Sequence, residues 1–239
     1  MKTITMTGAA DLLTRVPEPE LMDSAEQVAA YAGADFNESN QAFVDHLIDC
    51  CQPQPSHGRL LDLGCGPADI CIRLAQALPG WTIEGIDAGA NMLASARSRV
   101  ADAGLAKRIV LREVHLPDPL LAQQDFNCVV SNSLLHHLPD PQTLWQSIAQ
   151  AAAPDAWVQV MDLQRPQNPA QAHALVEQYA GAEPEVLRLD FHNSLNAAWR
   201  VDEVRDQLRQ AGLALDCTQV SDRHWMVSGR IGIDGKNPA

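Results

Sequence analysis

Basic charge is scarce in this sequence of 239 residues. Lysine and arginine together number 17 against 30 aspartates and glutamates, so the formal net charge is −13 at pH 7. Proteins that bind nucleic-acid phosphates usually present a basic surface. The composition therefore predicts no DNA partner, disfavours RNA, and favours a small molecule or a protein as the partner.

Long apolar runs are absent as well. No stretch approaches the roughly 20 consecutive apolar residues that a membrane-spanning helix requires. The segment MKTITMTGAADLLTRV lacks the apolar block of a secretory signal. We therefore expect a cytoplasmic protein with no membrane association.

The cysteines lack the spacing of a metal site or a disulfide framework. No C-x-x-C pair occurs among the six of them. Buried free thiols in a reducing compartment are the expected state. The six residues are Cys50, Cys51, Cys65, Cys71, Cys128 and Cys217.

The chain does contain a regular alternation of strand-like and helical segments. Its 46% apolar content is enough to bury one substantial core, so we expect a single domain over residues 1–239. From residue 59 onward, short β-rich runs alternate with helical segments, which predicts a doubly wound α/β fold with a Rossmann-like parallel sheet. The five expected parallel strands cover residues 59–64, 82–87, 108–114, 126–132 and 157–163.

Three further parts surround this cofactor-binding core, which we place at 57–165. Residues 1–56 are expected to form a helical extension or lid, with Ser24 and Gln27 spaced as a capping box. Residues 166–199 form an insert that is expected to line the acceptor site. Residues 200–231 supply a last helix and two strands, 214–220 and 224–231. The short SDR turn makes these two strands an antiparallel hairpin, so the sheet is mixed and seven-stranded.

The stretch LLDLGCGPADI places two glycines where the first strand must turn into a helix. Glycine there permits positive φ and lets a ligand approach the backbone, and the helix N-terminus favours an anion. The third glycine of the dinucleotide fingerprint is missing, because Asp69 stands in its place, and no phosphate-loop lysine follows. The turn therefore predicts a ligand without pyrophosphate.

Two aspartates near this turn indicate the rest of the ligand. Asp87 ends the second strand, 23 residues after Gly64, where a carboxylate can accept hydrogen bonds from both ribose hydroxyls. Asp62 lies two residues before the turn and is placed to orient the loop or to meet an ammonium group. A ligand with adenosine, an ammonium and a carboxylate suits these residues best.

The segments LLDLGCGPADI, IEGIDAGANML and SNSLLHHLPDP follow one another as in the class I S-adenosylmethionine-dependent methyltransferases, and the chain resembles that family over about residues 40–163. The resemblance implies S-adenosylmethionine as cofactor and S-adenosylhomocysteine as product. In relatives an N-terminal lid closes over the cofactor, so Tyr31 is a further candidate, with simple helix packing as the alternative. An adenine-binding aspartate common after the third strand is missing here. The implied cofactor residues are Tyr31, Asp62, Gly64, Cys65, Gly66, Asp87, Ala88, Met92, Val114, His115, Ser131 and Asn132.

Catalytic candidates come from this resemblance and from strand ends. In-line methyl transfer needs mainly positioning, and a base is required only for some acceptors. His136, Asp162 and His192 are the candidates, and Tyr179 is a further possible base. The alternatives are a turn-flanking histidine for His136, a salt bridge to Arg165 or a loop cap for Asp162, and helix packing around His192. Ser131 and Asn132 could simply cap the strand end.

No metal site is predicted, and metal-assisted methylation through Asp87 or Asp162 is left as an alternative. His136 and His137 are neighbours whose side chains are expected to diverge, and His137 is expected to be structural. We therefore expect a methyltransferase that acts on a small molecule. The rivals are a non-catalytic S-adenosylmethionine-binding partner of the same fold, a nicotinamide-dependent reductase, and a protein or RNA methyltransferase; homodimer formation is left open.

Overall fold

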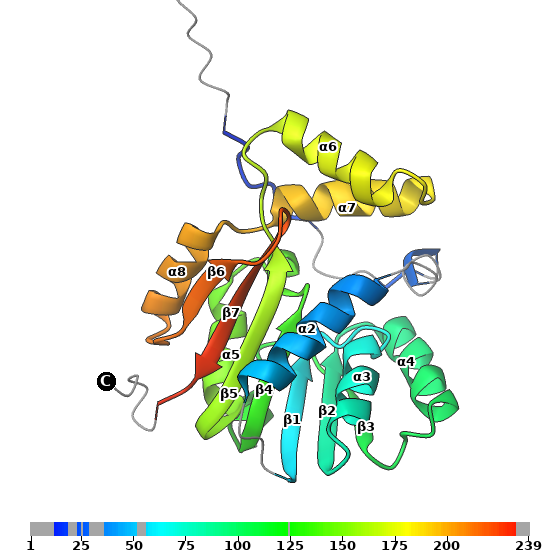
Figure 1. Ribbon diagram of the computed structural model, residues 1–239, viewed down its shortest axis with the longest axis vertical. Helices are drawn as coiled ribbons and strands as arrows, with labels where there is room; N and C mark the ends of the chain where they lie inside the picture. Colours follow the sequence, from blue (N-terminus) through cyan, green and yellow to red (C-terminus); the bar gives the residue numbers. More distant parts are fainter. Residues whose placement is uncertain are drawn as a thin grey trace, which may run out of the picture.

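The structure is a computed structural model that describes residues 12–18, 23–24, 26–28, 36–51, 56–123 and 125–232. Its seven-stranded sheet has the order β3-β2-β1-β4-β5-β7-β6 (Figure 1). The first five strands are parallel, and β7 is antiparallel to both of its neighbours. The strands are β1 (Gly58–Leu63), β2 (Trp81–Asp87), β3 (Ile109–Glu113), β4 (Phe126–Asn132), β5 (Ala152–Leu163), β6 (Asp216–Gln219) and β7 (His224–Arg230).

Helices cover both faces of this sheet. Neighbouring residues of β1 point to opposite faces, so Leu60 belongs to one buried cluster and Leu61 to the other. The cluster around Leu60 is closed by α2, α3 and α4, and the cluster around Leu61 by α5 and α8. The helices are α2 (Asn37–Cys50), α3 (Asp69–Ala77), α4 (Ala90–Asp102), α5 (Gln142–Ala151), α6 (Pro169–Ala180), α7 (Glu185–Ala197) and α8 (Val201–Gln210), with short 3-10 turns η1 (Pro119–Gln123) and η2 (Leu135–His137).

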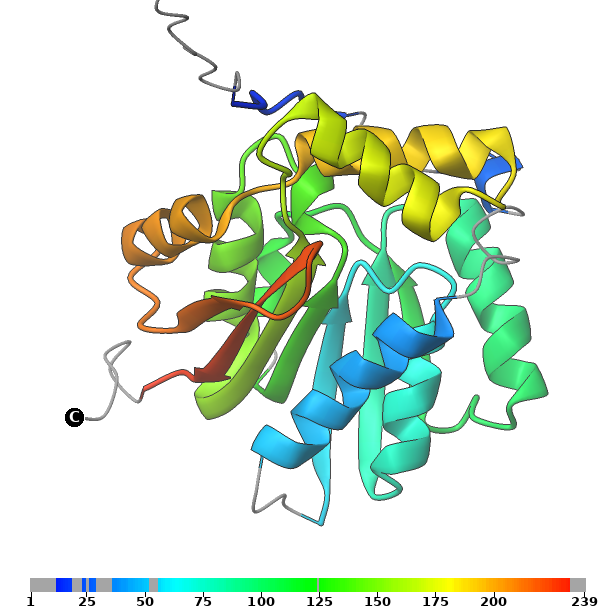
Figure 2. The same cartoon turned by 45° about the horizontal axis from the view of Figure 1, so that its top comes forward.

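Helices α6 and α7 form a separate layer over the end of the sheet where the parallel strands finish (Figure 2). The helix α6 begins with Pro169 and is capped by Asn168, whose side chain accepts a hydrogen bond from the Gln171 N–H at 2.9 Å. Leu163 at the end of β5 packs with residues of both helices. This layer therefore covers the carboxyl ends of the strands, where α/β proteins bind ligands.

The expected doubly wound fold with its closing antiparallel strands is confirmed. The helix α2 covers the second helix expected in the N-terminal segment, and the Ser24 hydroxyl accepts the Gln27 N–H of the predicted capping box at 3.1 Å. The strand β5 starts at Ala152, earlier than expected, because the chain enters it directly from α5 and reaches regular pairing after a bulge opposite Phe126 and Cys128. None of the described helices has the length and apolar character that crossing a bilayer requires.

Candidate active site

A cavity of about 410 Å³ lies at the carboxyl ends of β1, β2 and β4. Gly64 and Gly66 line this cavity, and their φ angles are +75° and +49°. These positive φ angles favour glycine, which has no Cβ. Ala68, at φ 65°, takes the same left-handed conformation at the start of α3, where it is strained for a residue with a Cβ. The expected cofactor residues that line it are Asp62, Gly64, Cys65, Gly66, Asp87, Ala88, Met92, Val114, His115 and Asn132.

Asp87 ties the two loops of this cavity together. One carboxylate oxygen accepts the Gly66 N–H and the other the Gly89 N–H, both at 2.8 Å. Burial raises the pKa of Asp87, and these backbone hydrogen bonds partly offset that effect. The acidic end of β2 therefore shapes the glycine turn as well as facing the cavity.

Asp62 lies deeper in the same wall. Its side chain is fully buried, and one of its carboxylate oxygens accepts a hydrogen bond from the Cys71 thiol at 3.1 Å. Burial raises the pKa of Asp62 to about 7, although the Cys71 hydrogen bond acts in the opposite direction. No cation accompanies this carboxyl among the described residues, so a positively charged ligand group would find a partner there.

The end of β4 separates two candidates of the sequence analysis. Ser131 is fully buried, and its hydroxyl donates to the Leu63 carbonyl at 2.8 Å, as in the strand-capping alternative. Asn132 lines the cavity, and its amide donates to the Asn40 side chain at 3.2 Å. The Asn132 amide oxygen is buried without a hydrogen-bond partner in the described part of the chain. Tyr31 and nearly half of residues 1–56, the proposed lid, lie outside the described residues.

A second cavity of about 270 Å³ adjoins the first. It lies under α6 and α7, and its other walls come from α2, the ends of β4 and β5, η2 and the loop before β7. The insert 166–199 was expected to line the acceptor site, and Asp190, Phe191 and Ser194 of α7 line this cavity. Five residues line both cavities: Phe36, Asn40, Asn132, Ser133 and His137.

His136 and Asp162 form a buried pair beside the second cavity. The His136 Nδ1 lies 2.5 Å from one Asp162 oxygen, and the His136 N–H donates to the other at 3.0 Å. Burial lowers the pKa of His136, but the Asp162 charge and hydrogen bond outweigh it, so the pKa is raised. Burial acts to raise the pKa of Asp162, but the charge and the hydrogen bond of His136 outweigh burial, so the pKa is lowered. The alternative partner Arg165 instead pairs with Glu203 at 2.6 Å.

The expectation that the neighbouring histidines diverge is wrong. The rings of His136 and His137 lie 4.1 Å apart between centroids, because the 3-10 turn η2 brings both side chains to one side. Both rings meet Glu18, which the sequence analysis did not consider. Glu18 Oε1 lies 3.3 Å from His136 Nε2 and 3.2 Å from His137 Nδ1.

Glu18 was not among the predicted site residues, because it lies 118 residues before His136 in the sequence. The segment 12–18 is held by long-range hydrogen bonds. The Val16 N–H donates to the Asn196 carbonyl at 3.0 Å, and Arg15 donates to the carbonyls of Ala197 and His136. No local motif in this segment signals its position.

His192 does not join this group. It lies on α7 and contacts Asn196, one turn further along the same helix, and it lines neither cavity. The neighbouring Phe191 lines the second cavity instead. Tyr179 also lines it, but its hydroxyl donates to Asp222 at 2.7 Å.

Comparison with known proteins yields a family match and several relatives. A model of the methyltransferase domain matches residues 36–218. The trans-aconitate 2-methyltransferase of Rhodococcus jostii is 30% identical over 217 residues, which cover 82% of this chain and 74% of that protein. The enzyme of the same name from Mycobacterium tuberculosis is 36% identical over 126 residues, 53% of this chain and 44% of the relative. The matched part thus spans less than half the length of the mycobacterial protein.

Solved structures share the fold at lower identity. An S-adenosylmethionine-dependent methyltransferase from Aquifex aeolicus aligns with a TM-score of 0.64 at 15% identity, over 88% of this chain and 100% of that one. Phosphoethanolamine N-methyltransferase 2 of Haemonchus contortus, solved with S-adenosyl-L-methionine, aligns with a TM-score of 0.58 at 18% identity, over 82% of this chain and 44% of that one. These likenesses concern the fold.

Proposed function

This chain belongs to the class I S-adenosylmethionine-dependent methyltransferases, and from that membership we propose that it methylates a small molecule. The cofactor site is the cavity at the ends of β1 and β2, and the acceptor site is the adjoining cavity under α6 and α7. Bound S-adenosylmethionine supplies a sulfonium-activated methyl group. The observation that carries the proposal is that the two cavities adjoin and share five lining residues.

The residues of the first cavity fit this cofactor. We assign Asp87 to the ribose and Ala88 and Met92 to the adenine, and all three residues line the cavity. The buried Asp62 carboxyl offers a partner for the ammonium group, and the unpaired Asn132 oxygen offers a further acceptor. A cavity of about 410 Å³ is in the range of small-molecule and cofactor sites.

The residues of the second cavity would orient the acceptor and exclude water. His137 and Asn132 face both ligands, and His136 faces the acceptor alone. Asp162 acts behind His136 as a positioning residue, because its carboxylate holds the ring and the backbone of His136. Of the three catalytic candidates we keep His136 and Asp162 and set His192 aside.

The charges around the second cavity favour a neutral or cationic acceptor over a tricarboxylate. Glu38, Glu183 and Asp190 line it, against the single guanidinium of Arg223, which also contacts Asp222 at 3.2 Å. His224 adds no charge near neutral pH, because burial lowers its pKa to about 4. Like charges disfavour a polyanion in such a site.

We place the protein in the cytoplasm. All six cysteines are free thiols and five of them are buried, as expected in a reducing compartment. The net charge of −13 supports a small-molecule acceptor over nucleic acid.

Calorimetry followed by an acceptor screen tests the proposal. The full chain is titrated with S-adenosylmethionine, S-adenosylhomocysteine and NADH, and then incubated with trans-aconitate and with neutral and amine-bearing acceptors. We expect binding of both sulfur ligands, no binding of NADH, and release of S-adenosylhomocysteine with a neutral or cationic acceptor. Binding of NADH alone would overturn the methyltransferase proposal. Cofactor binding without turnover on any acceptor would instead support a non-catalytic relative.

A further inference from the structure

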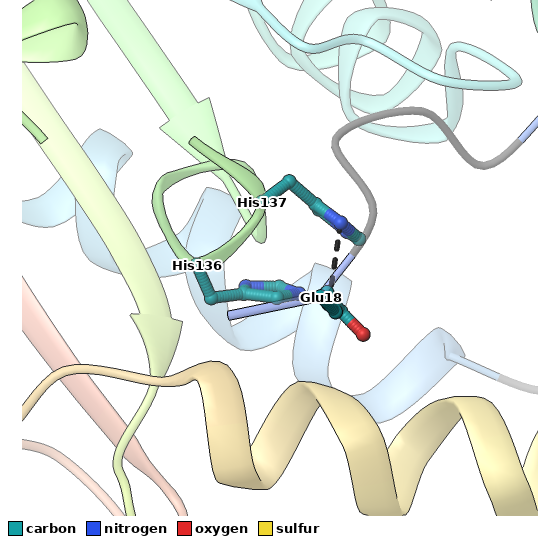
Figure 3. A group of neighbouring side chains, drawn as sticks. All are labelled: Glu18, His136 and His137. Carbon is teal, nitrogen blue, oxygen red and sulfur yellow. Dashed lines mark ion pairs between the residues drawn. The ribbon is translucent and has the colours of Figure 1, made fainter. Parts of the chain in front are cut away.

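The side chains of Glu18, His136 and His137 lie close together (Figure 3). His137 lines both cavities, and His136 lines the second. Among the residues that the structure describes, these three form the group whose nitrogen and oxygen atoms gather as metal ligands do. The two histidines come from η2 and the glutamate from the N-terminal segment. Three potential ligands therefore meet from two parts of the chain that are far apart in sequence.

The distances suit a small metal ion. Zn²⁺ binds histidine nitrogen and carboxylate oxygen at about 2.0–2.2 Å, so tetrahedral ligand atoms lie roughly 3.3–3.6 Å apart. Glu18 Oε1 is 3.3 Å from one imidazole nitrogen and 3.2 Å from the other. All three ligand atoms lie within 4.8 Å of one another.

Asp162 supplies the outer support that metal-binding histidines commonly have. An ionised carboxylate only accepts hydrogen bonds, so the His136 Nδ1 beside it carries the proton. In the neutral imidazole this leaves the lone pair on Nε2, the nitrogen that faces Glu18. The Asp162 carboxylate is itself fixed by the N–H groups of His136 and Leu163, at 3.0 and 2.6 Å. A carboxylate behind a histidine in this way orients the ring for a metal.

Burial and charge point in the same direction. The side chains of His136, Glu18 and His137 are only 3%, 9% and 12% exposed. The carboxylates of Glu18 and Asp162 both contact the histidine rings. The nearby cation, Arg15, donates a hydrogen bond to the His136 carbonyl oxygen and not to either carboxylate. Buried carboxylates of this kind need a cation or a proton to balance them.

We propose that Glu18, His136 and His137 bind a divalent transition-metal cation, for which Zn²⁺ is the best match. Two histidines and one glutamate form a known set of three protein ligands that leaves a fourth position for water or substrate. His136 lines the acceptor cavity and His137 lines both cavities, so that position faces the acceptor. A cation there lowers the pKa of a hydroxyl or thiol bound to it. Only this placement beside the acceptor rests on the proposed function.

Metal binding by the full chain tests the proposal without any methyl transfer. Protein freed of metal with a chelator is titrated with Zn²⁺ by calorimetry and, in parallel, with Co²⁺, whose visible absorption reports tetrahedral coordination. The variants are Glu18→Gln and His137→Asn, with Glu185→Gln and His173→Asn as exposed controls on α7 and α6. Cys50→Ser removes the one exposed thiol, which lies 3.6 Å from the His46 ring.

We expect one tightly bound equivalent of Zn²⁺ and a rise in the unfolding temperature of the native chain with added metal. Glu18→Gln and His137→Asn should each weaken binding at least about tenfold, and the controls and Cys50→Ser should leave it unchanged. S-adenosylmethionine binding, measured on the same samples, reports the proposed function separately. The proposal is overturned if the native chain binds no Zn²⁺ or if binding persists when Glu18→Gln and His137→Asn are combined; His136 would then be a proton-bearing bridge between two carboxylates.

Discussion

The two cavities of this protein are built in different ways. The proposed cofactor cavity is formed mainly by the ends of strands β1, β2 and β4 and by the turns that directly follow β1, β2 and β3, although residues of α2 and η2 that also line the second cavity contribute to it. The acceptor cavity combines α2, the η2 turn, the end of β5, α6, α7 and the loop before β7, with Glu18 of the N-terminal segment behind it. A short motif can specify the first arrangement, whereas the second exists only after the chain has folded.

The carboxylates beside the two cavities also differ in the groups that they contact. Asp87 in the cofactor region bonds to backbone N–H groups of adjacent loops. Asp162 in the acceptor region holds a buried histidine side chain and that residue's backbone. The structure around the proposed cofactor cavity therefore depends on hydrogen bonds to the backbone of its loops. The structure around the proposed acceptor cavity depends on the buried pair of His136 and Asp162.

The largest expected effect comes from Asp162→Ala. Removal of the carboxylate leaves the His136 ring and two backbone N–H groups without their buried acceptor, so the free energy of unfolding should fall by about 3–5 kcal/mol. Urea unfolding measures this change, with Asp102→Ala at the exposed end of α4 as the control. A loss below about 1 kcal/mol would show that the buried pair does not stabilise the acceptor region.

Asp87→Ala tests the cofactor region directly. The carboxylate accepts two backbone hydrogen bonds and is proposed to hold the ribose, and each hydrogen bond to a charged group is worth about 1.5–3 kcal/mol. The affinity for S-adenosylmethionine should therefore fall at least about 100-fold in calorimetric titration, while Asp102→Ala binds normally. Unchanged affinity would mean that the ligand does not use this strand end.

A smaller effect should depend on pH and on Asp62. Its folded-state pKa of about 7 lies above the ordinary value of 3.8, so the folded state retains the proton longer than the unfolded state does. The stability that this retained proton gives is complete below about pH 4 and is lost as the pH rises through 7.

Asp62→Asn keeps an acceptor for the Cys71 thiol and removes this titration. Between about pH 5 and pH 8, the stability of the native chain should therefore fall by about 2–3 kcal/mol relative to the variant. Unfolding curves at both pH values measure the difference. Parallel pH dependence of the two proteins would show that Asp62 is ionised throughout.

The smallest effect is expected for His192→Ala. The side chain contacts Asn196 on its own helix and lines neither cavity. Both the free energy of unfolding and the turnover of an identified acceptor should stay close to the native values, within about 0.5 kcal/mol. A large loss of turnover at unchanged stability would place the acceptor nearer to α7 than the cavity indicates.

Sequence reasoning predicted the fold correctly because its signals are local, and for the same reason most of the residues proposed for the cofactor line one cavity. The strand periods, the glycine turn and Asp87 all follow from neighbouring residues, and each lies where it was expected. It also named His136 and Asp162 separately, but not as partners, since their pairing depends on the adjacency of β4 and β5.

The acceptor region could not be read in this way. Glu18 lies beside the histidines because Arg15 and Val16 donate hydrogen bonds to carbonyl groups at the C-terminal end of α7, and no pattern within residues 12–18 reports those contacts. The rings of His136 and His137 lie together because η2 is a 3-10 turn, which the sequence analysis did not anticipate. Local signals thus specify the residues of the proposed cofactor cavity, and tertiary contacts form the proposed acceptor cavity.

A crystal structure of the full chain with S-adenosylhomocysteine tests the central claim most directly. The account predicts the ribose at Asp87, the amino group near Asp62, and the sulfur facing the wall formed by Asn132 and His137. The space under α6 and α7 should remain open to an acceptor. A ligand seated under those helices, or a ribose away from Asp87, would contradict the assignment of the two cavities.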